Sequence, residues 1–537
     1  MELYEHQKRA VEFFKDKCEI ALFFEMGCGK TCTSLSIAIG KYKAGLITNV
    51  LVVAPNEVHR QWYMDLKDQE SILYHALNDS GVEADVQIIG GRYGQKALHD
   101  YIPGKLNVLC CNIDTFSTPH KWEPVVEWAT INKTALIVDE ATVIKNPTSK
   151  RSQRMLYEFN NVVKSGKTIK SSSKLPNTQV RMVLTGTPVT NGPIDLWAIM
   201  EFIKPNYFGR NYYSFMNYYG MHTRLNVQDR VVQVLLTEKT WRGIKDCSDY
   251  MEALALFGCS EDTYLTIKSQ DHFLGPYKHA DELKKLLEPN AIFCKLTDCV
   301  DMPAKNYVLK KIPLSQAQEA CYNNMKHDLL AQFADHITTA TNKMVVTLRL
   351  QQISSGFIMG HEEIIDEDAP MWSDEYDVGP DEIVWLDDCN PRMAQLLRDV
   401  DEMARPCIIF TRFSAEAAKI YELLKDKYSV CLMTGWKTIG DIEKFKTGEY
   451  DIMVANIAKM SRGYNLQIAH NTIYYSNTFS MEHRAQSEFR TFRIGQTHPC
   501  TYVDYESCAV DKLVNDSIKL KKNMLEYIRE KDVSKLV

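Results

Sequence analysis

The sequence lacks the features that mark membrane, secreted and zinc-finger proteins. Among its 537 residues, no apolar run approaches the ~18 to 20 residues that a membrane helix needs. The first residues mix charged with apolar side chains, unlike the hydrophobic region of a signal peptide. The 15 cysteines form no C-x-x-C pair and no cysteine–histidine pattern of zinc-finger spacing. We therefore expect reduced thiols in a cytosolic compartment, no membrane partner and no structural zinc.

Acidic residues slightly outnumber basic ones, 69 to 63, so the chain carries a net charge of −6. The excess of acidic residues comes from one segment: residues 361–391 hold 12 Asp and Glu and no Lys or Arg, so the rest of the chain carries a net charge of +6. Conversely, residues 145–181 hold nine Lys and Arg against the single acid Glu158. This basic run is predicted either to bind phosphates or to be a solvated loop. The acidic run is either a solvated hairpin or an element that competes with a polyanion for basic surface.

What is present is an alternation of short apolar runs and helical patterns, which is typical of an α/β fold with parallel sheets. The first block of buried-strand candidates comprises Ile20–Phe24, Val50–Ala54, Val108–Ile113, Ala135–Val138 and Met182–Leu184. The second block comprises Cys407–Phe410, Val430–Met433, Ile452–Val454, Thr472–Tyr475 and Thr501–Val503. Between the blocks, residues 239–287, 317–333 and 341–353 have helical composition. The pattern predicts two similar α/β lobes with helical insertions between them.

The stretch EMGCGKT predicts a phosphate-binding loop. The strand candidate IALFF leads into it, and a helical pattern, TSLSIAI, follows. In such an arrangement the backbone N–H groups of Gly27, Cys28 and Gly29 cradle phosphates at the start of the helix. Lys30 is expected to reach the β- and γ-phosphates of ATP, and the Thr31 hydroxyl is expected to hold Mg²⁺. ATP and Mg²⁺ are therefore the predicted nucleotide and metal.

The stretch ALIVDE supplies the acids that such a loop requires. Four apolar residues end at Asp139 and Glu140, an arrangement that places carboxylates at the C-terminal edge of a parallel strand. Asp139 is predicted to hold Mg²⁺, directly or through water, and Glu140 to orient and deprotonate the attacking water.

The charge that develops on a transferred phosphoryl group also needs a cation from outside the loop. In the stretch HRAQSEFRTFRIGQ, Gln486, Arg490 and Arg493 fall at i, i+4 and i+7, which predicts one face of a helix. We expect Arg490 and Arg493 to be catalytic. A surface stripe of two arginines is the alternative.

Taken together and in order, these motifs resemble those of Swi/Snf-type ATP-dependent DNA translocases of helicase superfamily two. In the first block the resemblance covers LYEHQKRAVEFF, EMGCGKT, LVVAPNEVHRQW, CNIDTF, LIVDEATVIKN and the especially specific MVLTGTPVTNGPIDLW with FIKP. It continues through LSQAQEACYNNM, LRLQQISSGF, CIIFTRF, ANIAKMSRGYNLQIAHNTIYYSN and QSEFRTFRIGQ. The resemblance implies two RecA-like parallel-sheet lobes with ATP in the cleft between them. The chain is similar to the compact, motor-only members found in bacteria and phages.

The resemblance also implies roles that the residues alone do not. Gln7 is placed to recognise adenine, and Gln486 is placed at the nucleotide. Contacts with the DNA backbone are implied for Thr185, Thr187, Thr411 and Asn465.

Three departures from the family pattern affect these expectations. Phe24 stands where the family has an acid or a phosphate loop has glycine, but both loop glycines remain, so a competent cradle is expected. Thr142 replaces a histidine that couples the ATP site to the lobe interface, so coupling is expected to change while hydrolysis survives. Met460 and Ser461 replace a glycine pair, which affects the expected contact geometry with DNA.

By this resemblance, residues 1–205 form lobe 1 and 206–290 its helical insertion. Residues 291–400 form the lobe junction, a helical protrusion and the acidic segment, and 401–537 form lobe 2 with a C-terminal helix. We expect a monomeric, ATP-dependent translocase on double-stranded DNA that remodels DNA structures or displaces a bound protein. It is expected in bacterial or host-cell cytoplasm, at the nucleoid. A strand-separating helicase on single-stranded or forked DNA or RNA, and a DNA-bound scaffold with a vestigial ATPase, are the alternatives.

Overall fold

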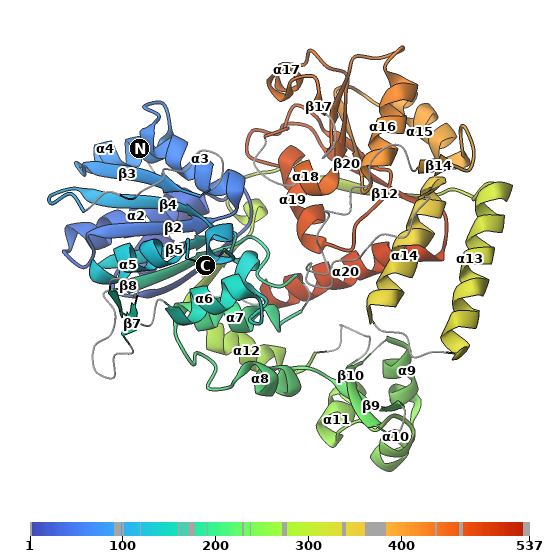
Figure 1. Cartoon of the computed structure of the whole chain (residues 1–537), viewed down its shortest axis with the longest axis horizontal. Coiled ribbons are helices and arrows are strands. Elements are labelled where there is room, and N and C mark those ends of the chain that lie inside the picture. The colour runs from blue at the N-terminus through green and yellow to red at the C-terminus, as the bar shows by residue number, and fades with distance from the viewer. Residues whose placement is uncertain are drawn as a thin grey trace. The chain divides into compact units, whose positions relative to one another are not determined.

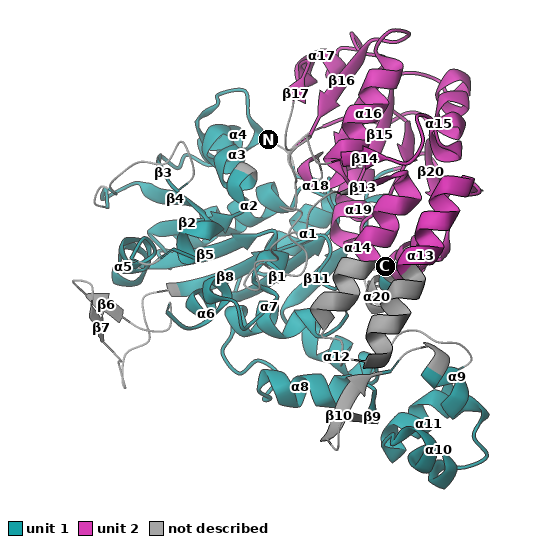
Figure 2. Cartoon of the chain, turned by 45° about the vertical axis from the view of Figure 1, so that its right-hand side comes forward, with its two compact units in different colours: residues 1–300, 520–537 teal, residues 301–519 magenta. Residues whose placement is uncertain are grey.

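The computed structural model forms two compact units. Unit 1 comprises residues 1–300 and 520–537, and unit 2 comprises residues 301–519 (Figure 2). The structure describes residues 3–90, 98, 101–118, 120–158, 162–164, 167–169, 178–190, 192–227, 230–236, 238–270, 277–335, 340–359, 383–434, 438–460 and 465–529. The finer division into four segments stays a prediction.

Unit 1 is built on a seven-stranded sheet in which every pairing is parallel (Figure 1). From edge to edge its strands are β11 (Ala291–Cys294), β1 (Glu19–Phe24), β8 (Thr178–Leu184), β5 (Thr134–Asp139), β2 (Asn49–Ala54), β4 (Leu106–Asn112) and β3 (Ala84–Ile89). Every residue of β2, β4 and β5 is buried, so both faces of the sheet are covered. These continuous apolar runs are why the sequence alone located the strands.

Helices connect and cover these strands. They are α1 (Glu5–Phe13), α2 (Lys30–Lys43), α3 (Asn56–Lys67), α4 (Ile72–Asp79), α5 (Glu123–Ile131), α6 (Lys150–Tyr157), α7 (Asp195–Ile203) and α12 (Ala280–Leu287). Short 3₁₀ turns lie at η1 (Ile113–Phe116), η2 (Ala141–Ile144) and η4 (Leu296–Asp298), and β6 (Val162–Lys164) pairs with β7 (Lys167–Ile169) in a small hairpin.

The predicted helical insertion is not purely helical. It contains α8 (Tyr212–Tyr219), α9 (Glu238–Asp246), α10 (Tyr250–Phe257), α11 (Glu261–Ser269) and an antiparallel pair, β9 (His222–Val227) with β10 (Arg230–Leu235). The run RVVQVL is rich in β-branched residues, which favours a strand. A separate apolar cluster that includes Trp241, Ile244 and Ile267 holds this part together. Within α8, Phe215 and Tyr219 are buried and their rings pack 4.5 Å apart, so the two act as core residues.

Unit 2 repeats the α/β plan with a seven-stranded sheet. Its strands, in spatial order, are β12 (Lys305–Lys311), β20 (Cys500–Glu506), β19 (Asn471–Tyr474), β15 (Cys407–Thr411), β18 (Ile452–Asn456), β16 (Val430–Met433) and β17 (Thr438–Ile439). Only the pairing of β17 with β16 is antiparallel. A continuous core of Leu, Ile, Val and Tyr side chains packs against this sheet. The two parallel-dominated sheets confirm the predicted fold class.

The helices of unit 2 complete the second layer system. They are α13 (Gln316–Asp335), α14 (Ala340–Ser355), α15 (Pro391–Glu402), α16 (Ser414–Leu424), α17 (Ile442–Lys446), α18 (Ile457–Met460) and α19 (Met481–Thr491), with α20 (Ala509–Arg529) crossing the unit boundary. β13 (Phe357–Met359) precedes the acidic run and pairs with β14 (Ile383–Trp385), which lies within it; residues 361–382 of the run lie outside the described residues. Within the described residues, no helix combines the length and apolar character needed to cross a bilayer.

Candidate nucleotide-binding site

The phosphate loop has the backbone conformation that a phosphate cradle requires. It runs from the end of β1 to the first residue of α2, and Gly27 and Gly29 take φ values of 88° and 73°. These values lie in the left-handed region, which glycine enters at little cost. The first N–H groups of α2 have no partners within the helix, so they are available to an anion. The Gly-Cys-Gly sequence and the helix start therefore have the conformation that the predicted cradle requires, and phosphate binding itself stays a prediction.

Gln7 supports the loop from behind. Its side chain is buried, its Oε1 accepts a hydrogen bond from the Tyr4 backbone N–H at 2.9 Å, and its Nε2 lies 3.4 Å from the carbonyls of Cys28 and Gly29. A Cβ atom on Gly29 would lie 2.1 Å from that same nitrogen. The glutamine is therefore packed directly against the loop, and its implied contact with adenine stays a prediction.

The acid motif lies at the end of a strand next but one to β1. Asp139 ends β5 and is only 3% exposed, and its Oδ1 accepts a hydrogen bond from the Glu140 N–H at 2.9 Å. Burial raises the pKa of Asp139, while the nearby Lys30 ammonium and a hydrogen bond from the indole of Trp62 oppose that rise. The structure thus brings together Lys30 of the loop and Asp139 of the acid motif, as predicted.

Trp62 is a site residue whose role the sequence did not reveal. Its Nε1 donates a 2.8 Å hydrogen bond to Asp139 Oδ2, and the indole is 2% exposed. Trp62 comes from α3, which follows β2, the neighbour of β5. One carboxylate oxygen is held by the indole and the other by the backbone, so the orientation of Asp139 is fixed before any metal binds.

Glu140 has an unusual backbone conformation. Its φ of 52° is in the left-handed region, which costs a non-glycine residue of the order of 1–3 kcal/mol. The side chain is 8% exposed. Thr142, at the position where histidine was expected, lies in the following 3₁₀ turn. Its hydroxyl donates a long hydrogen bond, 3.5 Å, to the Glu140 carbonyl oxygen. The hydroxyl therefore contacts the turn that carries the predicted base.

The ligands expected for Mg²⁺ have suitable chemistry. The Asp139 carboxylate and the Thr31 hydroxyl are hard oxygen donors, which Mg²⁺ prefers. Thr31 is half-buried in the first turn of α2, one residue from Lys30. An oriented, buried carboxylate beside the phosphate loop fits the predicted metal.

The LTGTP segment packs against the phosphate loop. A Cβ atom on Gly186 would lie 3.2 Å from the Phe24 carbonyl and 3.3 Å from the Met26 nitrogen, so only glycine allows this approach without displacement. Thr185 and Thr187 are both buried, and the Thr185 hydroxyl accepts a hydrogen bond from the Thr187 N–H at 3.1 Å. Both threonines build this turn, and their implied DNA contacts stay predictions.

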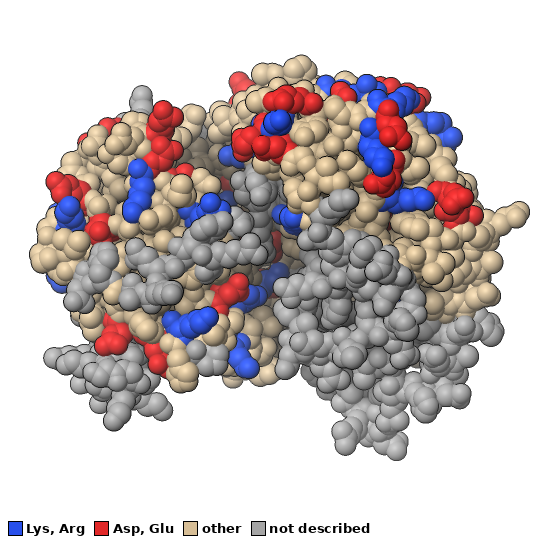
Figure 3. Space-filling view, turned by 45° about the horizontal axis from the view of Figure 1, so that its top comes forward, with Lys and Arg blue, Asp and Glu red and all other residues tan. Residues whose placement is uncertain are grey.

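The basic run supplies internal contacts as well as surface charge. Lys145 Nζ donates to Thr190 Oγ1 at 2.6 Å, and Arg181, which is 7% exposed, donates to the Phe202 carbonyl at 2.9 Å. Residues 159–161, 165–166 and 170–177 of the run lie outside the described residues. On the face shown in Figure 3, described Lys and Arg side chains alternate with Asp and Glu, with no continuous basic surface there. Arg181 is thus a core residue.

In unit 2, the three residues predicted on one helical face are only partly so arranged. Gln486 and Arg490 lie on α19 and are buried, but the helix ends at Thr491, so Arg493 lies beyond it. The single-face prediction for Arg493 is therefore wrong, because Phe492 already leaves helical geometry, with ψ of 86°. Burial lowers the pKa of Arg493.

Gln486 has an incompletely satisfied side chain. Its Nε2 donates to Glu482 at 3.2 Å, whereas its Oε1 is buried and has no hydrogen-bond partner among the described residues. A buried carbonyl oxygen without a partner is costly, and a ligand that donates to it would remove that cost.

The remaining predicted contacts lie at the C-terminal edge of the second sheet and in the loop before β19. Thr411 ends β15, is fully buried and donates to the Phe413 carbonyl at 3.0 Å. Asn465 is partly buried and its Oδ1 accepts from the Gln467 N–H at 3.3 Å. Ser461 lies outside the described residues, so the altered glycine pair is not placed.

Comparison with known proteins identifies the family. The SNF2-related domain matches residues 6–356, which is 351 of the 537 residues, so the chain belongs to the SNF2-related family. This confirms the resemblance to Swi/Snf-type ATPases of helicase superfamily two, and with it the predicted enzyme class.

Individual relatives are distant. The chain is 22% identical over 483 residues to a putative ATP-dependent helicase/translocase, YwqA, of Bacillus subtilis, covering 88% of this chain and 42% of that protein. It is 26% identical over 214 residues to CHROMATIN REMODELING 24 of Arabidopsis thaliana, covering 38% of this chain and 17% of that protein. The chain thus spans less than half the length of these relatives. A SWI2/SNF2 ATPase core from Sulfolobus solfataricus, solved with double-stranded DNA, aligns over 99% of this chain and 94% of that chain, with 17% identity and a TM-score of 0.36.

Proposed function

We propose that this protein is an ATP-dependent translocase on double-stranded DNA. The observation that carries the proposal is the buried Asp139 carboxylate, oriented by Trp62 and lying near Lys30 of a glycine-rich phosphate loop. If Asp139 only formed a salt bridge, its two carboxylate oxygens would not both need a fixed hydrogen-bond donor beside a helix N-terminus. The arrangement suits a metal–nucleotide complex, and membership of the SNF2-related family adds DNA as the effector.

In the proposed reaction, unit 1 binds the nucleotide. The N–H groups of Gly27 to Gly29 hold phosphate oxygens, and Lys30 compensates the charge on the β- and γ-phosphates. Asp139 and Thr31 hold Mg²⁺, which neutralises charge on the phosphates when it is bound. Glu140 accepts a proton from the attacking water.

Unit 2 supplies the transition-state cations in this proposal. Arg490 and Arg493 approach the γ-phosphate only when the cleft closes, so hydrolysis is coupled to the movement of one lobe against the other. DNA is held mainly through its phosphates, which makes binding largely independent of sequence. Cycles of closing and opening then move the protein along the duplex, where it remodels DNA structures or displaces a bound protein.

The test is the ATPase rate with linear duplex, single-stranded, forked and four-way DNA at one fixed salt concentration. We expect duplex DNA to stimulate strongly and single strands weakly. Displacement of a third strand from a triplex, without separation of the duplex strands, would then report translocation. Lys30→Ala should abolish both activities while leaving DNA binding intact.

Two other outcomes would redirect the proposal. Stronger stimulation by single strands or forks, together with strand separation, would indicate a helicase. A Lys30→Ala variant with unchanged ATPase and biological activity would indicate a DNA-bound scaffold. The intact glycine conformations at Gly27 and Gly29 argue against the scaffold, because a decayed loop has no need to keep them.

A further inference from the structure

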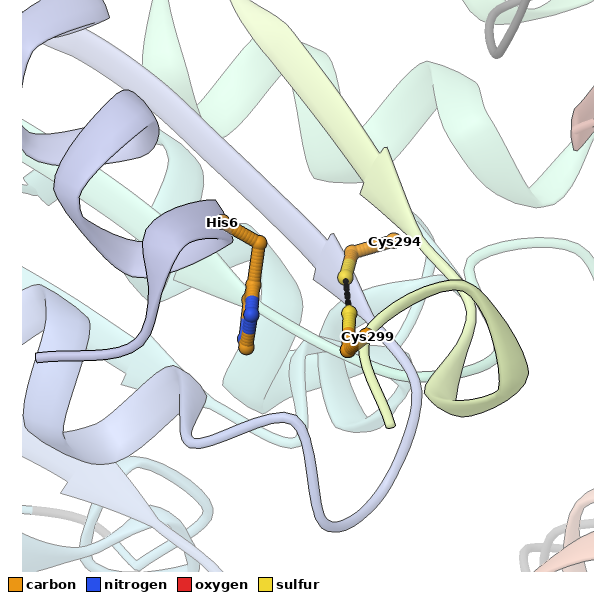
Figure 4. Close-up of side chains that lie close together, drawn as sticks. All are labelled: His6, Cys294 and Cys299. Atoms are coloured by element: carbon orange, nitrogen blue, oxygen red, sulfur yellow. Dashed lines mark hydrogen bonds between the residues drawn. The ribbon is translucent and has the colours of Figure 1, made fainter. Parts of the chain in front are cut away.

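Three side chains that can bind soft metal ions lie together beside the phosphate loop, on the side opposite β5, the strand that ends at Asp139. They are His6 of α1, Cys294 at the end of β11, and Cys299 just after η4 (Figure 4). One imidazole nitrogen and the two sulfurs all lie within 4.8 Å of one another, and the two sulfurs are 2.9 Å apart. The pairing of β1 with β11 brings these segments together although they lie almost 300 positions apart.

A fourth thiol belongs to the loop itself. Cys28, between the two cradle glycines, is 1% exposed and its Sγ lies 4.0 Å from the Cys294 carbonyl oxygen. The same thiol interacts with the Cys294 and Cys299 thiols. The donor atoms of His6, Cys294 and Cys299 are the ones that lie within 4.8 Å of one another, and Cys28 offers a neighbouring fourth donor. Three sulfurs and one imidazole are a common ligand set of structural zinc sites.

The imidazole of His6 is held in place through one of its ring nitrogens. Its Nε2 lies 2.8 Å from the Cys28 carbonyl oxygen. When Nε2 carries the proton and donates this hydrogen bond, Nδ1 keeps its lone pair. Metal-binding histidines commonly donate such a hydrogen bond from the ring nitrogen that does not bind the metal. The ring also stacks on Tyr4, with centroids 6.0 Å apart, and lies 5.7 Å from the ring of Phe24. Phe24, which departs from the family pattern, therefore forms an apolar wall of the cluster.

The thiols are not ordinary buried cysteines. The three thiols interact with one another: hydrogen bonds with Cys28 and Cys294 lower the pKa of Cys299, whereas hydrogen bonds with Cys28 and Cys299 raise the pKa of Cys294. The thiolate is the form that binds metal, and metal binding releases the protons that the cluster shares.

We propose that His6, Cys28, Cys294 and Cys299 form a zinc-binding site behind the phosphate loop. Zinc suits three sulfurs and a nitrogen in tetrahedral geometry, whereas Mg²⁺ requires oxygen ligands. The site differs from the predicted magnesium site in ligands, position and chemistry. It was not foreseen from the sequence, because its ligands come from three separate segments and show no zinc-finger spacing.

The zinc site would restrain the loop through the segment that follows β11. The Leu296 N–H donates to Glu25 Oε2 at 2.9 Å, and the Leu296 methyl groups lie 3.6 and 3.7 Å from where a Cβ on Gly27 would be. A metal held by both Cys28 and this segment fixes the loop relative to β11. Zinc therefore preorganises the phosphate cradle, and its loss weakens ATP binding without removing any residue that contacts ATP.

The experiment measures metal in the full-length protein, which does not depend on ATPase activity. Purified protein from zinc-supplemented cells is expected to carry about one equivalent of zinc, as a single four-ligand site requires. Cys294→Ser and Cys299→Ser should each lose most of it. Cys18→Ser is the matched control, because Cys18 is also a partly buried cysteine of unit 1 but lies outside the cluster.

A second measurement needs no variant and so does not depend on how well a variant folds. Metal-free wild-type protein titrated with Co²⁺ should develop thiolate-to-cobalt charge-transfer absorption and the visible bands of tetrahedral cobalt, and Zn²⁺ should abolish both. Absence of these bands, or equal zinc content in Cys18→Ser, Cys294→Ser and Cys299→Ser, would overturn the proposal. A Cys294–Cys299 disulfide in peptide maps of freshly purified, unreduced protein would overturn it too, and would make the pair a redox site.

Discussion

The hydrogen bond from Trp62 to Asp139 gives a quantitative prediction. Trp62→Phe keeps an aromatic ring in the same buried position but removes the N–H that donates to the carboxylate at 2.8 Å. A hydrogen bond to a charged, buried group is worth about 1.5–3 kcal/mol, and 1.36 kcal/mol corresponds to about one pKa unit. Losing the bond should therefore raise the pKa of Asp139 further, on top of the rise that burial already causes.

The sign of the effect on activity follows from the protonation state. Asp139 must be ionised to hold a metal, so activity is lost as the pH falls through its pKa. A higher pKa moves this acid limb to higher pH. The assay is kcat/KM for ATP as a function of pH, with saturating DNA and Mg²⁺, and the acid limb of Trp62→Phe should lie at higher pH than that of the wild type.

The chain offers a matched control in Trp128. Its indole is 6% exposed, and its Nε1 has no hydrogen-bond partner among the described residues. Trp128→Phe changes the same atoms in a buried site of the same unit without touching Asp139. An acid limb that stays in place in Trp62→Phe, or that moves equally in both variants, would refute the argument.

Three other predictions concern the loop, the predicted arginine and the core of unit 2. Gly29→Ala should weaken ATP binding roughly five- to thirty-fold, because alanine in the left-handed backbone costs about 1–2 kcal/mol and its Cβ would lie 2.1 Å from the Gln7 side chain. Titration with a fluorescent nucleotide measures this affinity. An unchanged affinity would contradict the predicted cradle. Arg490→Lys should lower kcat about a thousandfold while ATP binding persists, since lysine cannot reproduce a planar guanidinium; a normal kcat would make Arg490 structural. Arg392→Ala should lower the free energy of unfolding, measured in urea, by about 3–5 kcal/mol. The reason is that Asp511, the buried ion-pair partner of Arg392, would be left with an uncompensated charge. A loss below about 1 kcal/mol would contradict this reasoning.

The central strands could be predicted because their residues are apolar on both faces. The candidates Val50–Ala54 and Ala135–Val138 lie within β2 and β5, whose every residue is buried. Edge strands escaped the same reasoning. β12 reads KNYVLKK and is mostly exposed, and β11 has only four residues, so neither shows the pattern of a buried strand.

The candidate site divides in a similar way. Lys30 is the first residue of α2, after the turn that follows β1, and Asp139 is the last residue of β5, so their meeting at one sheet edge follows from parallel topology. The hydrogen bond from Trp62 depends on how α3 packs, and the cluster around Cys294 depends on a strand pairing between the two ends of unit 1. Neither the hydrogen bond nor the cluster produces a recognisable pattern in the sequence around its residues. The exit of Arg493 from α19 depends on one C-terminal turn, and periodicity is least informative at helix ends.

The pairing of β1 with β11 has a consequence for synthesis on the ribosome. Ala21 pairs with Ala291, 270 positions later. At ~5–20 residues per second, roughly 15 to 55 s pass between translation of the two strands. During that interval the nascent chain exposes one flank of β1, next to the glycine-rich turn, as an open edge that invites mispairing. Slow elongation or chaperone binding before residue 294 should therefore affect the yield of nucleotide-competent protein more than the same delay at a later codon.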